Sequence, residues 1–131
     1  MINRRTFAFA LLGSLALALP SLAQNSFSQR INATILAGET FVGQFLPSRG
    51  ARRISAIVRC EVKATAYLDI SNDIFNEDSI VLGASSVELK PKQAQILIVP
   101  AGLIDIQGVR IRVVNEDKTF GTVYATISVS R

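Results

Sequence analysis

The chain has 131 residues, of which 49% are hydrophobic, and a formal net charge of +4. So high an apolar content excludes an intrinsically disordered chain, and the low charge gives no indication of nucleic acid or a membrane surface as partner. The sequence contains no histidine and one cysteine, which excludes Ser-His-Asp and Cys-His catalytic sets, zinc sites of the usual spacing and an intrachain disulfide.

The N-terminal segment has the pattern of a cleavable secretory signal peptide. Arg4 and Arg5 are followed by an apolar run over residues 7–19 and by small residues that end at Ala23. The apolar run is too short to span a bilayer stably, which takes about 20 residues. We therefore expect a signal peptide over 1–23 and an exported domain over 24–131, periplasmic or extracellular at the cell surface, that meets a membrane only during export. Because Arg4-Arg5 also fits the twin-arginine pattern, the twin-arginine and general export routes both stay open.

The first strands of the mature chain are expected over Arg30–Ala37 and Thr40–Leu46. Apolar residues alternate with polar ones in the first segment. Gly38-Glu39 between them predicts a two-residue turn with glycine first, and thus a hairpin.

The segment Arg53–Ser71 has the strongest pattern of the chain. Its even positions from Ile54 to Ile70 are all apolar and its odd positions are nearly all polar, which predicts strand with one buried face. A two-residue hairpin would exchange the buried parity, and the parity stays even. We therefore predict two strand segments joined by a bend near Glu61–Lys63, with a hairpin of odd loop length as the alternative, and expect Cys60 to be buried as a small apolar residue.

The next segments are also expected to be strands. Ser79–Leu89 changes its apolar parity near Gly83–Ser86, which predicts a bulge or a break. After a turn at Pro91-Lys92, Gln93–Val99 contains four consecutive apolar residues, which is typical of a strand covered on both faces or of one near the centre of the core.

The final two strands are expected to form a hairpin. Val109–Val113 and Phe120–Ser130 both alternate, and residues 115–119 lie between them. With that loop, Arg112 would face Thr122 and Arg110 would face Tyr124.

These segments together predict an all-β fold. No stretch of the mature chain keeps a helical period over ten residues, and seven or eight short strands are separated by turn residues. We predict an antiparallel two-sheet β-sandwich of immunoglobulin-like or jelly-roll type.

Three groups of residues are candidate sites. The outward face of the last two strands mixes arginine with aromatic residues, as protein interfaces do, and it is our candidate partner face: Arg110, Arg112, Val114, Phe120 and Tyr124. A basic patch consists of Arg49, Arg52, Arg53 and Arg59. It suits acidic polysaccharide or lipid headgroups, and its ordinary explanation is a charged edge protected from aggregation. A weaker calcium candidate is the acidic loop with Asp73, Asn76, Glu77 and Asp78, which Asn115, Glu116 and Asp117 would supplement.

The composition favours a protein that binds over one that catalyses. We expect no cofactor, apart from the calcium candidate, and no enzyme activity. The most favoured function is protein–protein interaction, including self-association in a surface or envelope assembly. A secreted carbohydrate-binding module with Tyr67 or Tyr124 as stacking platform is the alternative, and a hydrolase with paired carboxylates is the least favoured.

Overall fold

A computed structural model describes residues 26–73, 80–99 and 106–130. The predicted signal peptide lies outside the described residues, and so do Asn76, Glu77 and Asp78 of the calcium candidate. Within the described ranges, no helix is long and apolar enough to cross a membrane. All the regular structure there is strand, in this order: β2 (Ser26–Ile35), β3 (Thr40–Val42), β4 (Leu46–Pro47), β5 (Arg53–Cys60), β6 (Ala64–Ser71), β7 (Ile80–Leu89), β8 (Gln95–Ile98), β9 (Gly108–Asn115) and β10 (Gly121–Ser130).

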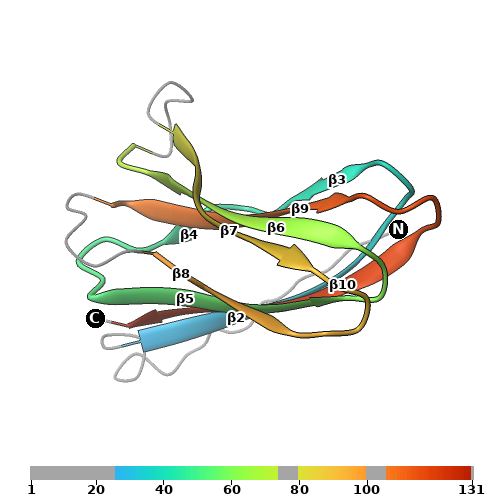
Figure 1. The fold of residues 1–131 in the computed structure, drawn as a ribbon. Coiled ribbons are helices and arrows are strands. Elements are labelled where there is room, and N and C mark those ends of the chain that lie inside the picture. Colours follow the sequence, from blue (N-terminus) through green and yellow to red (C-terminus); the bar gives the residue numbers. More distant parts are fainter. Residues whose placement is uncertain (1–25, 74–79, 100–105, 131) are drawn as a thin grey trace.

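The strands form two antiparallel sheets that pack face to face (Figure 1). The β10 sheet has the order β2-β10-β5-β8, and the β9 sheet has the order β3-β9-β6-β7, with β4 also paired to β9. In Figure 1 the β9 sheet lies above the β10 sheet. The predicted two-sheet β-sandwich is therefore confirmed.

The pairing follows one rule, which identifies the topology as a jelly roll. The first strand pairs with the last (β2·β10), and the pairs β3·β9, β5·β8 and β6·β7 follow inward along the chain. The chain is thus one long antiparallel hairpin, closed between β6 and β7, and rolled so that successive pairs lie in alternate sheets. Of the two sandwich types expected from the sequence, this order fits the jelly roll.

The long alternating segment forms the centre of the core, as predicted. Its even residues are buried in both strands, from Ile54 in β5 to Ile70 in β6, and Val62 between the strands is half-buried. The three residues 61–63 carry the chain from the β10 sheet to the β9 sheet, so the predicted bend is a corner of the sandwich. Cys60 is a free, fully buried thiol in this core.

The two predicted hairpins, one at the start of the domain and one at its end, are wrong, because their strands do not pair with each other. β2 and β3 lie in different sheets, and so do β9 and β10. The tight turn after β2 is centred on Ala37-Gly38, with Gly38 second and at a φ of 73°. Its closing hydrogen bond runs from Glu39 N–H to the Leu36 carbonyl at 3.0 Å. Gly38 has the positive φ that a type II turn requires at this position, which turns the chain toward the other sheet.

The fault predicted in the 79–89 strand is present as a bulge in β7. Leu68 pairs with Ser85, whereas Ile70 pairs with Val81, so three residues of β7 face the single residue Asp69. Gly83 occupies the middle of this bulge with a φ of 66°, where a side chain would strain the backbone.

The expectation that Gln93–Val99 is covered on both faces is wrong. The turn at Pro91-Lys92 is present, closed by Gln93 N–H donating to the Lys90 carbonyl at 3.1 Å. However, β8 is the last strand of the β10 sheet, with Leu97 buried and Ile96 and Ile98 exposed. The consecutive apolar side chains therefore point alternately into the core and into solvent.

Gly121→Ala is expected to lower the free energy of unfolding by about 1–3 kcal/mol. A Cβ at this position would lie 2.6 Å from Cγ2 and 3.1 Å from Cγ1 of Val62, in the corner between β5 and β6. Valine has few rotamers to relieve the clash. Urea unfolding measures the loss, and the Gly121→Ala/Val62→Ala pair is the control. A double variant that recovers none of the loss would show that this contact is not its cause.

Candidate functional site

A charged cluster lies on the outer face of the β9 sheet, where β6 and β9 run side by side. Tyr67 is paired with Arg112, and Asp69 is paired with Arg110. Their neighbours along the strands, such as Leu68 and Ile111, point into the core. Together with Phe45, which precedes β4, these residues form the Asp69 cluster: Phe45, Tyr67, Asp69, Arg110 and Arg112.

Asp69 is fully buried and accepts four hydrogen bonds. Its Oδ2 accepts from Arg110 Nε at 2.9 Å and from Arg112 Nε at 3.0 Å. Its Oδ1 accepts from Arg112 Nη2 at 3.1 Å and from the Gly83 N–H at 2.8 Å. The β7 bulge brings the Gly83 amide to the carboxylate, so it completes the set of donors.

The hydrogen bonds decide the charge of Asp69. Burial alone would raise the pKa of its carboxyl, but the bonds from Arg112, from the Gly83 amide and from Arg110 outweigh burial. The pKa of Asp69 therefore lies below its usual value, and the carboxylate in turn raises the pKa of Arg112. At neutral pH the cluster holds one negative and two positive charges.

Each arginine of the cluster also lies over an aromatic ring. The guanidinium carbon of Arg112 is 4.1 Å from the centroid of the Tyr67 ring, and that of Arg110 is 4.7 Å from the Phe45 ring. Such cation–π contacts hold the planar guanidinium groups in place. Asp69, Phe45 and Gly83 were not among the residues predicted for a site, because no local sequence pattern relates them to Arg110 and Arg112.

The predicted partner face is divided between two sheets. Arg110, Arg112 and Val114 lie on the outer face of the β9 sheet, whereas Tyr124 lies in β10 and pairs with Arg59 and Asn32. The predicted approach of Arg110 to Tyr124 is wrong. It is Arg59 that lies over the Tyr124 ring, at 4.7 Å.

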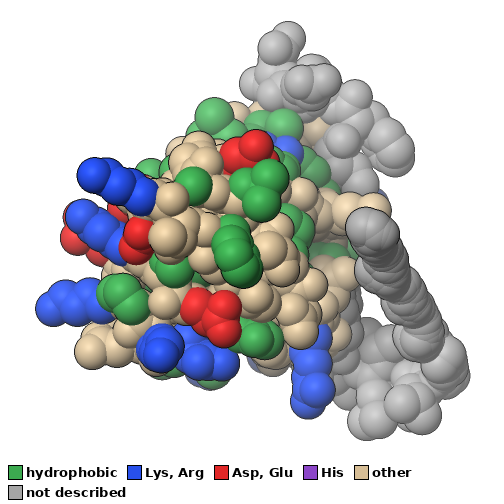
Figure 2. Space-filling model, turned by 90° about the vertical axis from the view of Figure 1, so that its right-hand side faces the viewer, with side chains coloured by type: hydrophobic (Ala, Val, Ile, Leu, Met, Phe, Trp, Pro, Cys, Tyr) green, Lys and Arg blue, Asp and Glu red, His purple; other side chains and the backbone are tan. Residues whose placement is uncertain are grey.

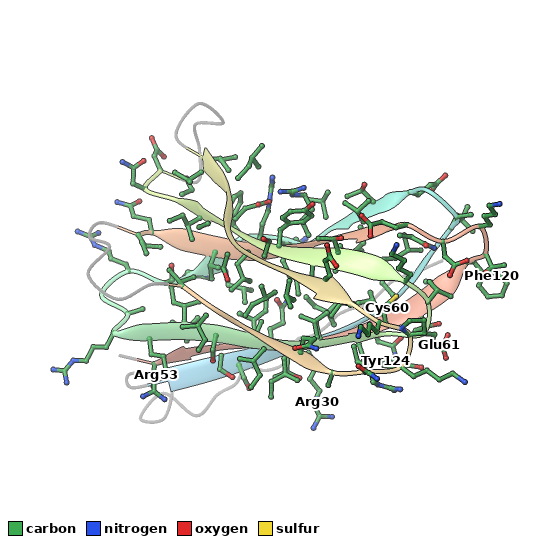
Figure 3. All side chains as sticks on the ribbon, in the orientation of Figure 1. Arg30, Arg53, Cys60, Glu61, Phe120 and Tyr124 are labelled. Atoms are coloured by element: carbon green, nitrogen blue, oxygen red, sulfur yellow. The ribbon has the colours of Figure 1, made fainter. Side chains whose placement is uncertain are left out.

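Phe120 lies apart from both groups, at the end of the sandwich (Figure 3). It belongs to the connection between β9 and β10 and is 65% exposed. Figure 2 shows this end, with hydrophobic, basic and acidic side chains interspersed. The five predicted residues therefore do not make one continuous face.

The predicted basic patch is also spread out. Arg53 begins β5 and Arg59 lies six residues farther along it, which separates them by about 20 Å at the rise of a strand. Arg49 and Arg52 belong to the loop before β5, on the side of Arg53. Figure 3 shows Arg53 at one end of the sandwich and Tyr124, the partner of Arg59, toward the other.

Two further groups of predicted residues take part in intramolecular contacts. For the calcium candidate, the side chain of Asn115 is buried, and its Nδ2 donates to the carbonyls of Ile35 and Thr119 at 3.0 Å each. Among the residues that the structure describes, no three acidic, histidine or cysteine side chains gather as metal ligands would.

The two tyrosines predicted as sugar platforms, Tyr67 and Tyr124, each have a guanidinium over one face of the ring.

An exposed apolar group lies on the outer face of the β10 sheet, at its β8 edge. Ile57 of β5 pairs with Ile96 of β8, and Ile98 follows on the same face. Their exposed fractions are 55%, 62% and 58%. We call Ile57, Ile96 and Ile98 the β8 patch. The alternation places Ile57 on the outward side of its strand, but the apolar run Ile96–Val99 suggested a covered strand, so the sequence did not reveal the patch.

Comparisons with known proteins establish the fold alone. No protein-family model matches the sequence, and no curated protein is significantly similar to it. The crystal structure of the PBSX exported protein XepA is similar with a TM-score of 0.63 and 13% identity, over 79% of this chain and 37% of that one. The crystal structure of PirA gives a TM-score of 0.51 and 17% identity, over 76% of this chain and 92% of that one.

Proposed function

We propose that the chain is an exported, non-catalytic β-sandwich that acts by protein binding, and that its β8 edge pairs with the same edge of a second copy. The observation that carries the proposal is the exposed, uncharged β8 patch, which lies on the last strand of the β10 sheet and on its neighbour β5. Export is supported by the secretory pattern of residues 1–23.

The backbone of β8 supports strand pairing at its outer edge. Val99 N–H donates to the Ile54 carbonyl at 3.0 Å. In an antiparallel ladder, hydrogen-bonded pairs alternate with non-bonded ones, so Leu97 and Gln95 also bond to β5. The N–H and C=O groups of Ile96 and Ile98 therefore point away from β5, toward the edge.

The side chains of this edge lack the usual protection against pairing. Edge strands are commonly protected by charges, proline or bulges. No charged residue or proline occurs over Gln93–Val99. By contrast β2, at the opposite edge of the same sheet, exposes the polar side chains of Ser28, Arg30, Asn32 and Thr34.

Self-pairing suits this edge because it is self-complementary. An antiparallel pair centred on Leu97 places Ile96 of one copy opposite Ile98 of the other, with their outward backbone groups in bonding register. Both cross-strand pairs are then isoleucine with isoleucine, and no like charges meet. The β10 sheets of two copies would join into one continuous sheet.

Ile96→Lys is expected to weaken self-association at least tenfold, about 1.4 kcal/mol. The substitution places a charge in each half of the paired edge, and sedimentation equilibrium of the mature chain, residues 24–131, measures the dissociation constant. Val81→Lys is the matched control, since Val81 is 55% exposed on β7, an edge strand of the other sheet. A wild-type chain that stays monomeric at high concentration, or equal weakening by Val81→Lys, would contradict the proposal.

A further inference from the structure

The Asp69 cluster has more positive charge and more hydrogen-bond donors than Asp69 uses. Two guanidinium groups carry ten N–H donors, and the carboxylate accepts three bonds from them. Among the described residues, Asp69 alone accepts hydrogen bonds from the side chains of these two arginines. With one carboxylate and two guanidinium groups, the cluster has a net charge of +1.

Within the described residues of β6 and β9, no second carboxylate neutralises this charge. The residues paired with Arg112 and Tyr67 on this face are the uncharged Val42 and Ser86. The acidic residue that pairs with β6 is Glu88 of β7, which lies opposite Thr65. Thr65 lies four residues from Asp69, which corresponds to about 13 Å along the strand.

The unused donors are held in a fixed position at the surface. Arg110 and Arg112 keep 18% and 20% of their side chains exposed, while their Nε atoms bind the buried carboxylate. The Tyr67 and Phe45 rings hold the guanidinium planes. A planar guanidinium that is already oriented binds a carboxylate in a fork, at little further cost in side-chain entropy.

We propose that the Asp69 cluster binds a side-chain carboxylate of an acidic peptide segment, with the outer N–H groups of Arg110 and Arg112 as donors. The exposed side chain of Val42, which pairs with Arg112, would contact an apolar neighbour of that carboxylate. The mixture of arginine, aromatic and aliphatic groups is that of protein-binding hot spots and favours a peptide over a sugar acid. This site lies on the β9 sheet and is independent of β8 pairing.

The test is a titration of the mature chain with a capped Leu-Glu-Glu-Leu peptide, followed by the Nε–H resonances of Arg110 and Arg112. We expect both resonances to shift, and the same peptide with glutamine in place of glutamate to bind at least tenfold more weakly. Arg110→Gln should weaken binding at least tenfold while leaving both bonds from Arg112 to Asp69. Phe45→Leu, which keeps all charges, should weaken binding by a smaller factor and serves if Arg110→Gln does not fold.

The matched control is Arg59→Gln, which removes the same charge from a cation–π pair on the other sheet. Arg59→Gln should leave the affinity unchanged. Equal binding of the glutamate and glutamine peptides, equal weakening by Arg59→Gln, or shifts caused by sulfate and an oligogalacturonate but not by the peptide would overturn the proposal.

Discussion

Asp69→Asn is expected to lower the free energy of unfolding by about 3 kcal/mol, because it leaves two guanidinium groups without their counter-ion. Removing one partner of a buried ion pair costs about 3–5 kcal/mol. The lower end applies because both arginines are partly exposed and regain some hydration. Urea unfolding of residues 24–131 measures the difference. Glu88→Gln, an exposed substitution of the same kind on the same sheet, should change stability by less than about 0.5 kcal/mol.

The stability lost in Asp69→Asn should depend on pH. Because the pKa of Asp69 is lowered in the folded chain, the unfolded chain binds more protons as the pH falls. The stabilisation is complete above the unfolded pKa of about 3.9 and is lost as the pH falls through the folded value. The difference between wild type and Asp69→Asn should therefore be constant near neutrality and shrink below about pH 4. A difference that grows toward acid pH would contradict the ionised pairing.

Asn115→Ala is expected to lower the free energy of unfolding by about 3 kcal/mol. The Asn115 side chain joins the end of β2 to the β9–β10 connection at one end of the sandwich. Its Nδ2 donates to the carbonyls of Ile35 and Thr119, and its Oδ1 accepts from Asp117 N–H at 2.8 Å. Truncation leaves these backbone groups without partners, at about 1–3 kcal/mol for a buried group.

Thermal and urea unfolding of Asn115→Ala measure this loss, with Asn32→Ala as control. Asn32 is an exposed asparagine on β2, and its replacement should be nearly neutral. A loss below about 1 kcal/mol for Asn115→Ala would show that backbone hydrogen bonds alone hold this end of the sandwich together. One such bond runs from Asn115 N–H to the Glu39 carbonyl at 2.9 Å.

The core could be predicted from the sequence because alternation reports the buried face directly. Every even residue from Ile54 to Cys60 and from Ala64 to Ile70 is buried, and the constant parity indicated a corner between the two strands. The same reasoning could not settle β9 and β10. Their inward residues are all odd, from Val109 to Val129, and this parity fits a hairpin in one sheet as well as a connection between facing sheets.

The candidate sites were less accessible to sequence reasoning, because they depend on pairing between distant segments. Asp69 meets Arg110 and Arg112 only through the register of β6 with β9, across 41 and 43 residues of chain. The exposure of Ile96 and Ile98 follows from the place of β8 at the end of its sheet order. Alternation shows which side chains of a strand face the core, but it does not show which strands lie beside it.

The pairing of β2 with β10 has a consequence for the order in which the chain folds. β10 lies between β2 and β5, so neither strand has its central neighbour until residues 121–130 have emerged. Contacts between such distant segments make folding slow, on the order of milliseconds to seconds for proteins of this class. If the chain crosses a translocon N-terminus first, it would thus remain open to chaperones until residues 121–130 are released, and loss of those residues would leave the β10 sheet without a central strand.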